Sequence, residues 1–284
     1  MIRLVLNADD LGLTAPLSDA IVRLRADGLV TDTSLLTCGE AFEDAARDLL
    51  ARGLTTTGIH LCVVGGEKPV SNPSEVPSLL RGGRFRTGWP SVAAAAAAGR
   101  IRVRDVEHEW EAQVVRALDA GLRVNHLDSH QHLHLLPTFL PVAIRLARRF
   151  GVEYVRAPGA SAKAERGSAG LGAAGKAKLL SAFGERARRM LRTVGLPDPP
   201  VAIGLAEAGR MTLPRWTALL SSLAPGTYEA VLHPGTGGGG TGSRYRWGYR
   251  WDEEAEALAT QELGSLFART EVEKISFADL PATP

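Results

Sequence analysis

Short apolar segments alternate along this chain with longer segments in which apolar residues recur every three or four positions. The short segments are typical of buried strands and the longer ones of amphipathic helices. We expect strands at residues 2–6, 33–37, 57–63, 123–127, 153–156, 201–205, 227–232 and 274–277. We expect helices near residues 16–26, 41–52, 103–120, 137–149 and 176–193. Repeated strand–helix units predict an α/β fold with a parallel sheet, either a barrel or a doubly wound sheet.

Three stretches interrupt this alternation. Residues 65–88 are rich in Gly, Pro and Ser, residues 159–175 are rich in Gly and Ala, and residues 235–250 begin with a glycine-rich run. Long loops in compact domains are usually functional or mobile. No internal repeat or domain boundary is visible, so we expect residues 1–284 to form a single domain.

Composition and charge narrow the class of protein. The 284 residues are 45% hydrophobic and 23% charged, as in ordinary globular proteins. A net charge of +2 gives no reason to expect a nucleic-acid partner. No apolar run is long enough to span a membrane or to act as a signal peptide. Two cysteines, Cys38 and Cys62, are too few for a disulfide framework, so we expect a cytoplasmic protein. Amphipathic helices would permit a homodimer.

Four of the seven histidines lie between residues 126 and 134. Histidine and aspartate alternate with other residues there, at His126, Asp128, His130, His132 and His134. An extended segment would place all five on one face. Buried polar groups need partners, and imidazole is the commonest neutral metal ligand. The segment therefore predicts one wall of a metal-dependent active site, with a polar edge strand or a histidine-rich turn as the alternative.

Other polar residues follow the predicted strands. They are Asn7, Asp9 and Asp10 after the first strand, His60 in the third, Arg156 at residues 153–156 and His233 after residues 227–232. The carboxyl ends of parallel strands are where α/β proteins build active sites. We therefore expect these side chains to meet the histidine cluster at one end of the sheet.

One carboxylate and two imidazoles, from Asp10, His60 and His130, would suit one divalent metal ion. Zn²⁺ fits this donor set best, with Mg²⁺, Mn²⁺, Co²⁺ or Fe²⁺ as alternatives. Asp9 would act as the general base and His233 as the general acid. Arg156 would pair with Asp9 and keep it ionised.

Several of these residues have simpler interpretations. Asp9 or Asp10 could cap the following helix, His60 could be a core histidine, and His233 could bond a turn carbonyl. Cys62 could serve as a soft ligand, although a small core residue is the commoner role. The remaining polar residues, which we expect to contact substrate or to support the ligands, are Asn7, His126, Asp128, His132 and His134.

The motifs at residues 7–12 (NADDLG), 58–61 (GIHL), 126–134 (HLDSHQHLH), 155–158 (VRAP) and 233–235 (HPG) resemble those of the YdjC-type carbohydrate deacetylases. That family includes chitooligosaccharide deacetylases and hopanoid-biosynthesis deacetylases. The resemblance implies a distorted (β/α) barrel, one divalent metal ion and removal of an N-acetyl group from a sugar. It places the ligands on Asp10, His60 and His130, the base on Asp9 and the acid on His233. Leu11 stands where the family usually has Phe, which is expected to alter packing beside the metal.

The main interpretation is a carbohydrate deacetylase that takes an N-acetylated sugar as substrate. Two other functions are alternatives. A metal-dependent phosphoesterase would use two metal ions and more carboxylates than this segment offers. A non-catalytic sugar-binding protein would not need both Asp9 and His233. Trp89, Trp247 and Tyr245 lie in loops and could stack on sugar rings.

Overall fold

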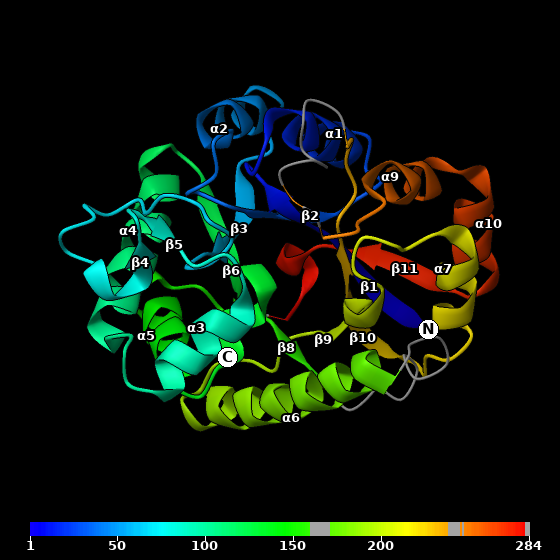
Figure 1. The fold of residues 1–284 in the computed structure, drawn as a ribbon. Coiled ribbons are helices and arrows are strands. Elements are labelled where there is room, and N and C mark those ends of the chain that lie inside the picture. Colours follow the sequence, from blue (N-terminus) through cyan, green and yellow to red (C-terminus); the bar gives the residue numbers. More distant parts are fainter. Residues whose placement is uncertain (160–170, 238–244, 246, 282–284) are drawn as a thin grey trace.

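The chain folds into a nearly closed barrel of parallel strands with helices around it (Figure 1). The computed structural model describes residues 1–159, 171–237, 245 and 247–281. The barrel strands are β1 (Ile2–Leu11), β2 (Asp32–Leu35), β3 (Thr56–Leu61), β6 (Arg123–Ser129), β7 (Tyr154–Val155), β8 (Ala157–Pro158), β9 (Val201–Ile203), β10 (Gly226–Leu232) and β11 (Val272–Ile275). They are ordered β7-β6-β3-β2-β1-β10-β9-β8, and β11 pairs with the first part of β1. Parallel pairing brings their carboxyl ends to the same end of the barrel.

One short segment supplies both edges of this strand order. Tyr154 of β7 pairs with His126 of β6, and Ala157 of β8 pairs with Val201 of β9. Only Arg156 separates β7 from β8, and its N–H donates to the carbonyl of Leu127 (2.9 Å). The segment therefore bridges β6 and β9, with Arg156 at its centre.

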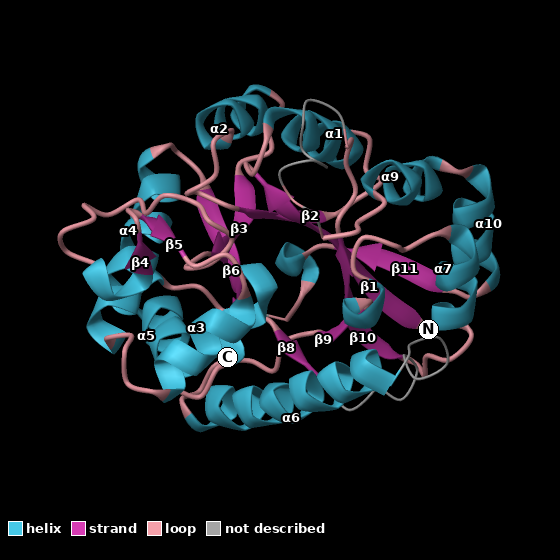
Figure 2. Cartoon of the chain, viewed as in Figure 1, coloured by secondary structure: helices cyan, strands magenta, loops and turns pink. Residues whose placement is uncertain are grey.

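Helices cover the outside of the barrel (Figure 2). They are α1 (Ala15–Ala26), α2 (Phe42–Ala51), α3 (Trp89–Ala97), α4 (Val103–Asp119), α5 (Leu140–Phe150), α6 (Leu171–Thr193), α7 (Leu213–Leu220), α9 (Trp251–Ala259) and α10 (Gln261–Arg269). Short 3₁₀ helices are η1 (Pro77–Leu79), η2 (His130–Leu135), η4 (Leu205–Glu207) and η5 (Phe277–Asp279). Among the described residues, no helix is both long and apolar enough to cross a membrane.

The two faces of β1 show how the sequence divides core from site. Leu4 and Leu6 are fully buried in the aliphatic core that also contains Ile21 of α1. Asn7 and Asp9 alternate with these residues, so they lie on the opposite face, where they contact polar groups of other strands. The barrel interior is therefore polar near the carboxyl end of β1.

The predicted strands and helices are all present, with ends shifted by a few residues. The barrel replaces the doubly wound alternative. One correction concerns the first strand, which continues to Leu11 because Asn7 and Ala8 still pair with β10. Asn7, Asp9 and Asp10 therefore lie within the strand and not after it. Helices α7, α9 and α10 were not predicted from the sequence.

The predicted loops are partly structured. Residues 65–88 contain η1 and the antiparallel hairpin of β4 (Leu80–Arg81) and β5 (Arg84–Phe85). The loop expected at residues 159–175 is shorter than predicted, because α6 already begins at Leu171. Residues 160–170 lie outside the described residues, as do 238–244 and 246 of the third predicted loop.

Candidate active site

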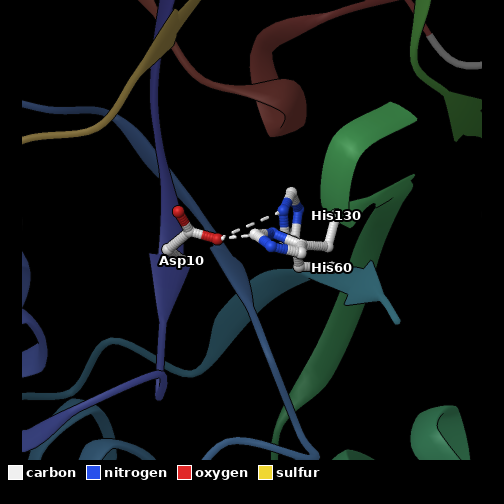
Figure 3. Close-up of side chains that lie close together, drawn as sticks. All are labelled: Asp10, His60 and His130. Atoms are coloured by element: carbon white, nitrogen blue, oxygen red, sulfur yellow. Dashed lines mark ion pairs between the residues drawn. The ribbon is translucent and has the colours of Figure 1, made fainter. Parts of the chain in front are cut away.

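Asp10, His60 and His130 come together at the carboxyl end of the barrel (Figure 3). They come from β1, β3 and the first residue of η2. Asp10 Oδ1 lies 3.0 Å from His130 Nδ1 and 3.5 Å from His60 Nε2. All three side chains are buried, and their donor atoms lie within 4.8 Å of one another. One cation could therefore contact all three residues, as the sequence predicted.

The surroundings of Asp10 fit a cation. Its Oδ2 is buried and accepts no hydrogen bond from any described residue, and Oδ1 faces the two imidazoles. Burial raises the pKa of Asp10, but the charges of His130 and His60 outweigh burial and the net pKa is lowered. An ionised, buried carboxylate with an unpaired oxygen is unfavourable unless a cation pairs with it.

Asp10 also has an unusual backbone conformation. Its φ is +65°, which few residues other than glycine adopt, although aspartate does so more readily than most. Gly12 follows with a φ of +88°, and the N–H of Leu13 donates to the carbonyl of Asp10 (3.1 Å). The turn places the Asp10 side chain beside the two histidines.

His60 is oriented by a second carboxylate. Its Nδ1 donates to Asp128 Oδ1 (2.8 Å), which leaves Nε2 facing Asp10. Burial lowers the pKa of His60, but the charges of Asp128, Asp9 and Asp10 raise it to about 9. A bound cation would replace this proton, because only the neutral imidazole is a ligand. Carboxylate–histidine pairs of this kind commonly orient metal ligands.

The prediction that five polar residues share one strand face is wrong beyond Asp128. The strand ends at Ser129 and the chain enters η2, where Gln131 and His132 both have a φ of +56°. The Ser129 hydroxyl accepts the N–H of His134 (2.8 Å), which stabilises the tight turn. The turn brings His130 to Asp10 and directs the later histidines elsewhere.

His134 lies inside the fold, away from the candidate ligands. Its Nδ1 is 2.6 Å from Ser129 Oγ and its Nε2 is 2.9 Å from the carbonyl of Arg156. Burial lowers the pKa of His134 to about 4, so the imidazole is neutral near pH 7. His134 thus supports the segment that carries Arg156. His132 is half-buried and lines the pocket described below.

Asp9 has a different set of partners from Asp10. Its two oxygens accept hydrogen bonds from Arg156, at Nη1 and Nη2, both at 2.7 Å. Asn7 Nδ2 also donates to Oδ1 (2.8 Å). Asp9 Oδ2 lies 4.0 Å from both His60 Nδ1 and His233 Nε2. The pairing of Asp9 with Arg156, expected from the sequence, is present.

Arg156 contacts two further carboxylates, and neither pairing was predicted from the sequence. Nη2 lies 2.6 Å from Asp128 Oδ2, and Nε donates to Glu229 Oε1 (2.7 Å). Burial lowers the pKa of Arg156, but Asp128, Asp9 and Glu229 raise it well above its usual value. A single charged residue inside the apolar strand β10 was the available signal for Glu229.

Ser34 joins the remaining predicted residues. Its hydroxyl accepts from Asn7 Nδ2 (2.8 Å), donates to Asp128 Oδ2 (2.7 Å) and lies 3.0 Å from His126 Nε2. The His126 ring stacks on Phe277 at 4.0 Å, and burial lowers the pKa of His126 to about 3. Asn7, His126 and Asp128 therefore form a hydrogen-bonded layer beneath the candidate ligands.

His233 lies across the site from His60. Its backbone N–H donates to Glu254 Oε1 (2.7 Å). Its ring packs edge-on against the ring of Tyr249, with 4.8 Å between the ring centroids. Burial lowers the pKa of His233 even though Asp9 and Asp10 oppose this effect. Neither Glu254 nor Tyr249 was anticipated, because nothing in the local sequence of α9 or the preceding loop distinguishes them.

A pocket of about 390 Å³ opens onto these residues. Asp9, His60, His130 and His233 line its inner end, and Trp247 packs against His130 with 5.0 Å between ring centroids. Most of the remaining wall is apolar, formed by Leu133, Leu136, Leu179, Leu180, Phe183, Leu205 and Ala208. Trp89, at the start of α3, also lines the pocket. Tyr245 is buried and donates to Glu67 Oε1 (2.7 Å).

Cys62 is buried directly after β3 and is not among the candidate ligands. Its thiol donates to the carbonyl of Val64 (2.9 Å). Cys38 and Cys62 are both free and buried. The metal-ligand interpretation of Cys62 therefore has no geometric support here.

The fold is thus a parallel α/β barrel that carries a candidate metal site of two histidines and one aspartate at its carboxyl end. The chain belongs to the YdjC-like protein family, whose model matches residues 3–269.

Curated relatives align with about half of the chain. A protein named carbohydrate deacetylase from Brevibacillus brevis is 37% identical over 151 residues, which is 53% of this chain and 57% of the relative. A protein named chitooligosaccharide deacetylase from Salmonella paratyphi B is 37% identical over 153 residues, 52% of this chain and 57% of the relative. The matched region thus spans less than two thirds of either relative.

The fold also occurs in a solved structure. A protein of Enterococcus faecalis V583, provisionally described as a cellobiose-phosphate cleavage protein, superimposes with a TM-score of 0.76. The match covers 99% of both chains at 22% identity. At this identity the likeness shows the fold alone.

Proposed function

We propose that the protein is a metal-dependent hydrolase that removes the N-acetyl group from an acetylated amino sugar and releases acetate. The observation that carries this proposal is the cluster of Asp10, His60 and His130 directly beside the Arg156-bound carboxylate of Asp9. Family membership and the names of the curated relatives support the same reaction. In this proposal residues 1–284 act as a single catalytic domain in a reducing cytoplasm.

Asp10, His60 and His130 would hold one divalent cation, and Zn²⁺ suits their donor atoms best. When bound, such an ion supplies Lewis acidity, which lowers the pKa of a water molecule and polarises a carbonyl oxygen. Asp128 keeps His60 in the tautomer whose Nε2 is free to bind.

Asp9 would accept the proton of the attacking water. Its two hydrogen bonds to Arg156 hold the carboxylate in one orientation. The same pairing separates the roles of two adjacent aspartates, because Asp10 has no such partner and faces the histidines.

His233 would protonate the departing amine. Its lowered pKa makes the resting imidazole neutral near pH 7, so the proton has to arrive during the reaction. Asp9 Oδ2 lies 4.0 Å from His233 Nε2, which places it to relay the proton taken from water. Transfer through these residues would return both to their starting state.

The apolar wall of the pocket bears on the substrate. A free chitooligosaccharide presents hydroxyl groups on most sides and would leave Leu133, Leu180 and Phe183 in contact with polar groups or water. An amino sugar linked to an apolar group would bury these side chains instead. The pocket therefore favours an N-acetylated sugar conjugate over a free oligosaccharide.

Acetate release tests the proposal. The protein would be stripped of metal, reloaded with Zn²⁺, Co²⁺, Mn²⁺ or Mg²⁺, and offered N,N′-diacetylchitobiose, octyl N-acetylglucosaminide and methyl N-acetylglucosaminide. We expect metal-dependent acetate release, with a lower KM for the octyl than for the methyl glycoside. Tight sugar binding without acetate release would instead support a sugar-binding protein. Two metal ions per chain together with phosphate-ester hydrolysis would support a phosphoesterase.

A further inference from the structure

Glu229 is a buried carboxylate to which neither the family motifs nor the proposed reaction gives a role. It lies in the middle of β10 and is fully buried. Its Oε1 lies 2.7 Å from Arg156 Nε and 2.6 Å from Nη2, while Oε2 accepts no hydrogen bond from any described residue. Burial raises the pKa of Glu229 to about 7, which marks the position as unfavourable for a carboxylate. Packing alone would favour an aliphatic residue there.

The contacts of Glu229 are explained by the shape of arginine. The guanidinium group is rigid and planar, so fixing its Nε side also fixes where Nη1 and Nη2 point. In Arg156 these two terminal nitrogens bind the two oxygens of Asp9. Glu229 on the Nε side and Asp128 at Nη2 therefore both constrain the plane of the group that holds Asp9.

The geometry points to Glu229 as a positioning residue that orients the catalytic carboxylate of Asp9 through Arg156. The inference rests on the proposed function, in which Asp9 is the base. Glu229 lies outside the group of Asp10, His60 and His130 and does not line the pocket. Glu229 contributes a hydrogen-bond acceptor at a defined place. The length of its side chain should therefore matter more than its charge.

Two variants separate the effect of side-chain length from the effect of charge. Glu229→Gln keeps an oxygen acceptor at full side-chain length but removes the charge. Glu229→Asp keeps the charge but withdraws the acceptor by one methylene. We expect Glu229→Gln to retain kcat within about threefold and Glu229→Asp to lose about 10–100-fold in kcat, because a displacement of about 1 Å can cost this much. KM and the bound metal per chain should stay near wild type in both.

A matched control is Asp105→Asn. Asp105 is also buried and bonded to an arginine, Arg102, but it lies at the start of α4 and does not line the pocket. We expect this variant to keep the wild-type kcat. If Glu229→Asp keeps full activity, or if Glu229→Gln loses as much as Glu229→Asp, the positioning role is wrong.

A double-variant comparison tests whether the effect passes through Asp9. In an Asp9→Asn background, Glu229→Asp should cause no further loss of the residual acetate release. If the losses of the two single variants multiply in the double variant, Glu229→Asp has a general structural effect and the inference is overturned.

One readout needs no substrate. The Arg156 Nε–H resonance, assigned by its absence in Arg156→Lys, should move and exchange faster with solvent in Glu229→Asp, and less so in Glu229→Gln. An unchanged resonance in Glu229→Asp would contradict the inference. If wild-type protein releases no acetate from any sugar while this resonance behaves as expected, the proposed function fails and the coupling of Glu229 to Arg156 stands.

Discussion

Arg156 binds the carboxylate of Asp9 through two parallel hydrogen bonds of 2.7 Å, across 147 positions of sequence. Arg156 lies between β7 and β8, and Asp9 lies near the carboxyl end of β1 on another side of the barrel. The pair gives Asp9 an environment unlike that of Asp10, whose oxygens face the histidines. Two adjacent carboxylates in unlike environments are suited to two roles, a base and a metal ligand.

The first prediction concerns Asp9→Asn. Asparagine keeps the size of the side chain and one acceptor oxygen for Arg156 but cannot accept a proton from water. We expect kcat for acetate release to fall by about 10²–10⁴-fold, the usual contribution of a general base. Metal content, measured by elemental analysis after gel filtration, should stay at the wild-type level.

Asp44→Asn serves as the control for this variant, because Asp44 is 70% exposed on α2 and, among the described residues, forms an ion pair only with Arg47. Asp44→Asn should match wild type in both kcat and metal content. A fully active Asp9→Asn enzyme would remove Asp9 as the base, whereas loss of metal would make Asp9 a ligand.

The second prediction concerns Asp128→Asn. The amide cannot hold His60 Nδ1 as a charged acceptor does, and it weakens the contact with Arg156. We expect Zn²⁺ affinity to fall by about 10–100-fold, as is typical when a group that orients a metal ligand is altered. Competition with a chromophoric chelator measures this affinity directly.

Asp198→Asn, which removes a half-exposed carboxylate near α6, should leave the affinity unchanged. Wild-type affinity in Asp128→Asn would show that His60 does not depend on Asp128 for its orientation.

The alternation of apolar and amphipathic segments was enough to predict the parallel α/β fold, because strand and helix periodicities differ clearly in this chain. Closure into a barrel could not be derived from those patterns. It depends on the two-residue strands β7 and β8 on either side of Arg156, which are too short to have a periodicity. The family resemblance, and not the pattern, favoured the barrel.

The candidate ligands could be predicted because Asp10, His60 and His130 are polar residues at the ends of apolar strands. The course of the chain after Ser129 could not, because the positive φ angles of Gln131 and His132 depend on tertiary contacts. Ser34 and Glu254 were missed for another reason. Each is an ordinary residue in its element and becomes part of the site only through distant partners.

The third prediction tests the packing beneath the site. A Cβ atom on Gly58 would overlap the ring of His126, which is held by Ser34 and stacked on Phe277. The ring cannot move without breaking these contacts, so Gly58→Ala should destabilise the protein by about 1–3 kcal/mol or more. Urea unfolding followed by circular dichroism measures the change.

Gly264→Ala is the matched control for Gly58→Ala. Gly264 lies within α10, and a Cβ atom there would meet nothing within 4 Å. Alanine should therefore stabilise the protein by about 0.5–1 kcal/mol, the difference between the two residues in a helix. Equal effects of the two substitutions would contradict the packing argument.

The fourth prediction concerns the pH dependence of stability and uses His134. Burial lowers the pKa of His134 to about 4, below the ordinary value of 6.5, so the folded protein holds a neutral imidazole while the unfolded chain takes up a proton. Its contribution to stability is therefore complete above pH 6.5 and is lost as the pH falls from 6.5 toward 4, by up to about 1.4 kcal/mol per pH unit. The difference in unfolding free energy between wild type and His134→Gln should then narrow by roughly 2 kcal/mol between pH 7 and pH 4.5.

Urea unfolding in the presence of a chelator, at constant ionic strength, would measure this difference. If the difference in unfolding free energy between wild type and His134→Gln stays constant with pH, the fold does not hold His134 in its neutral form.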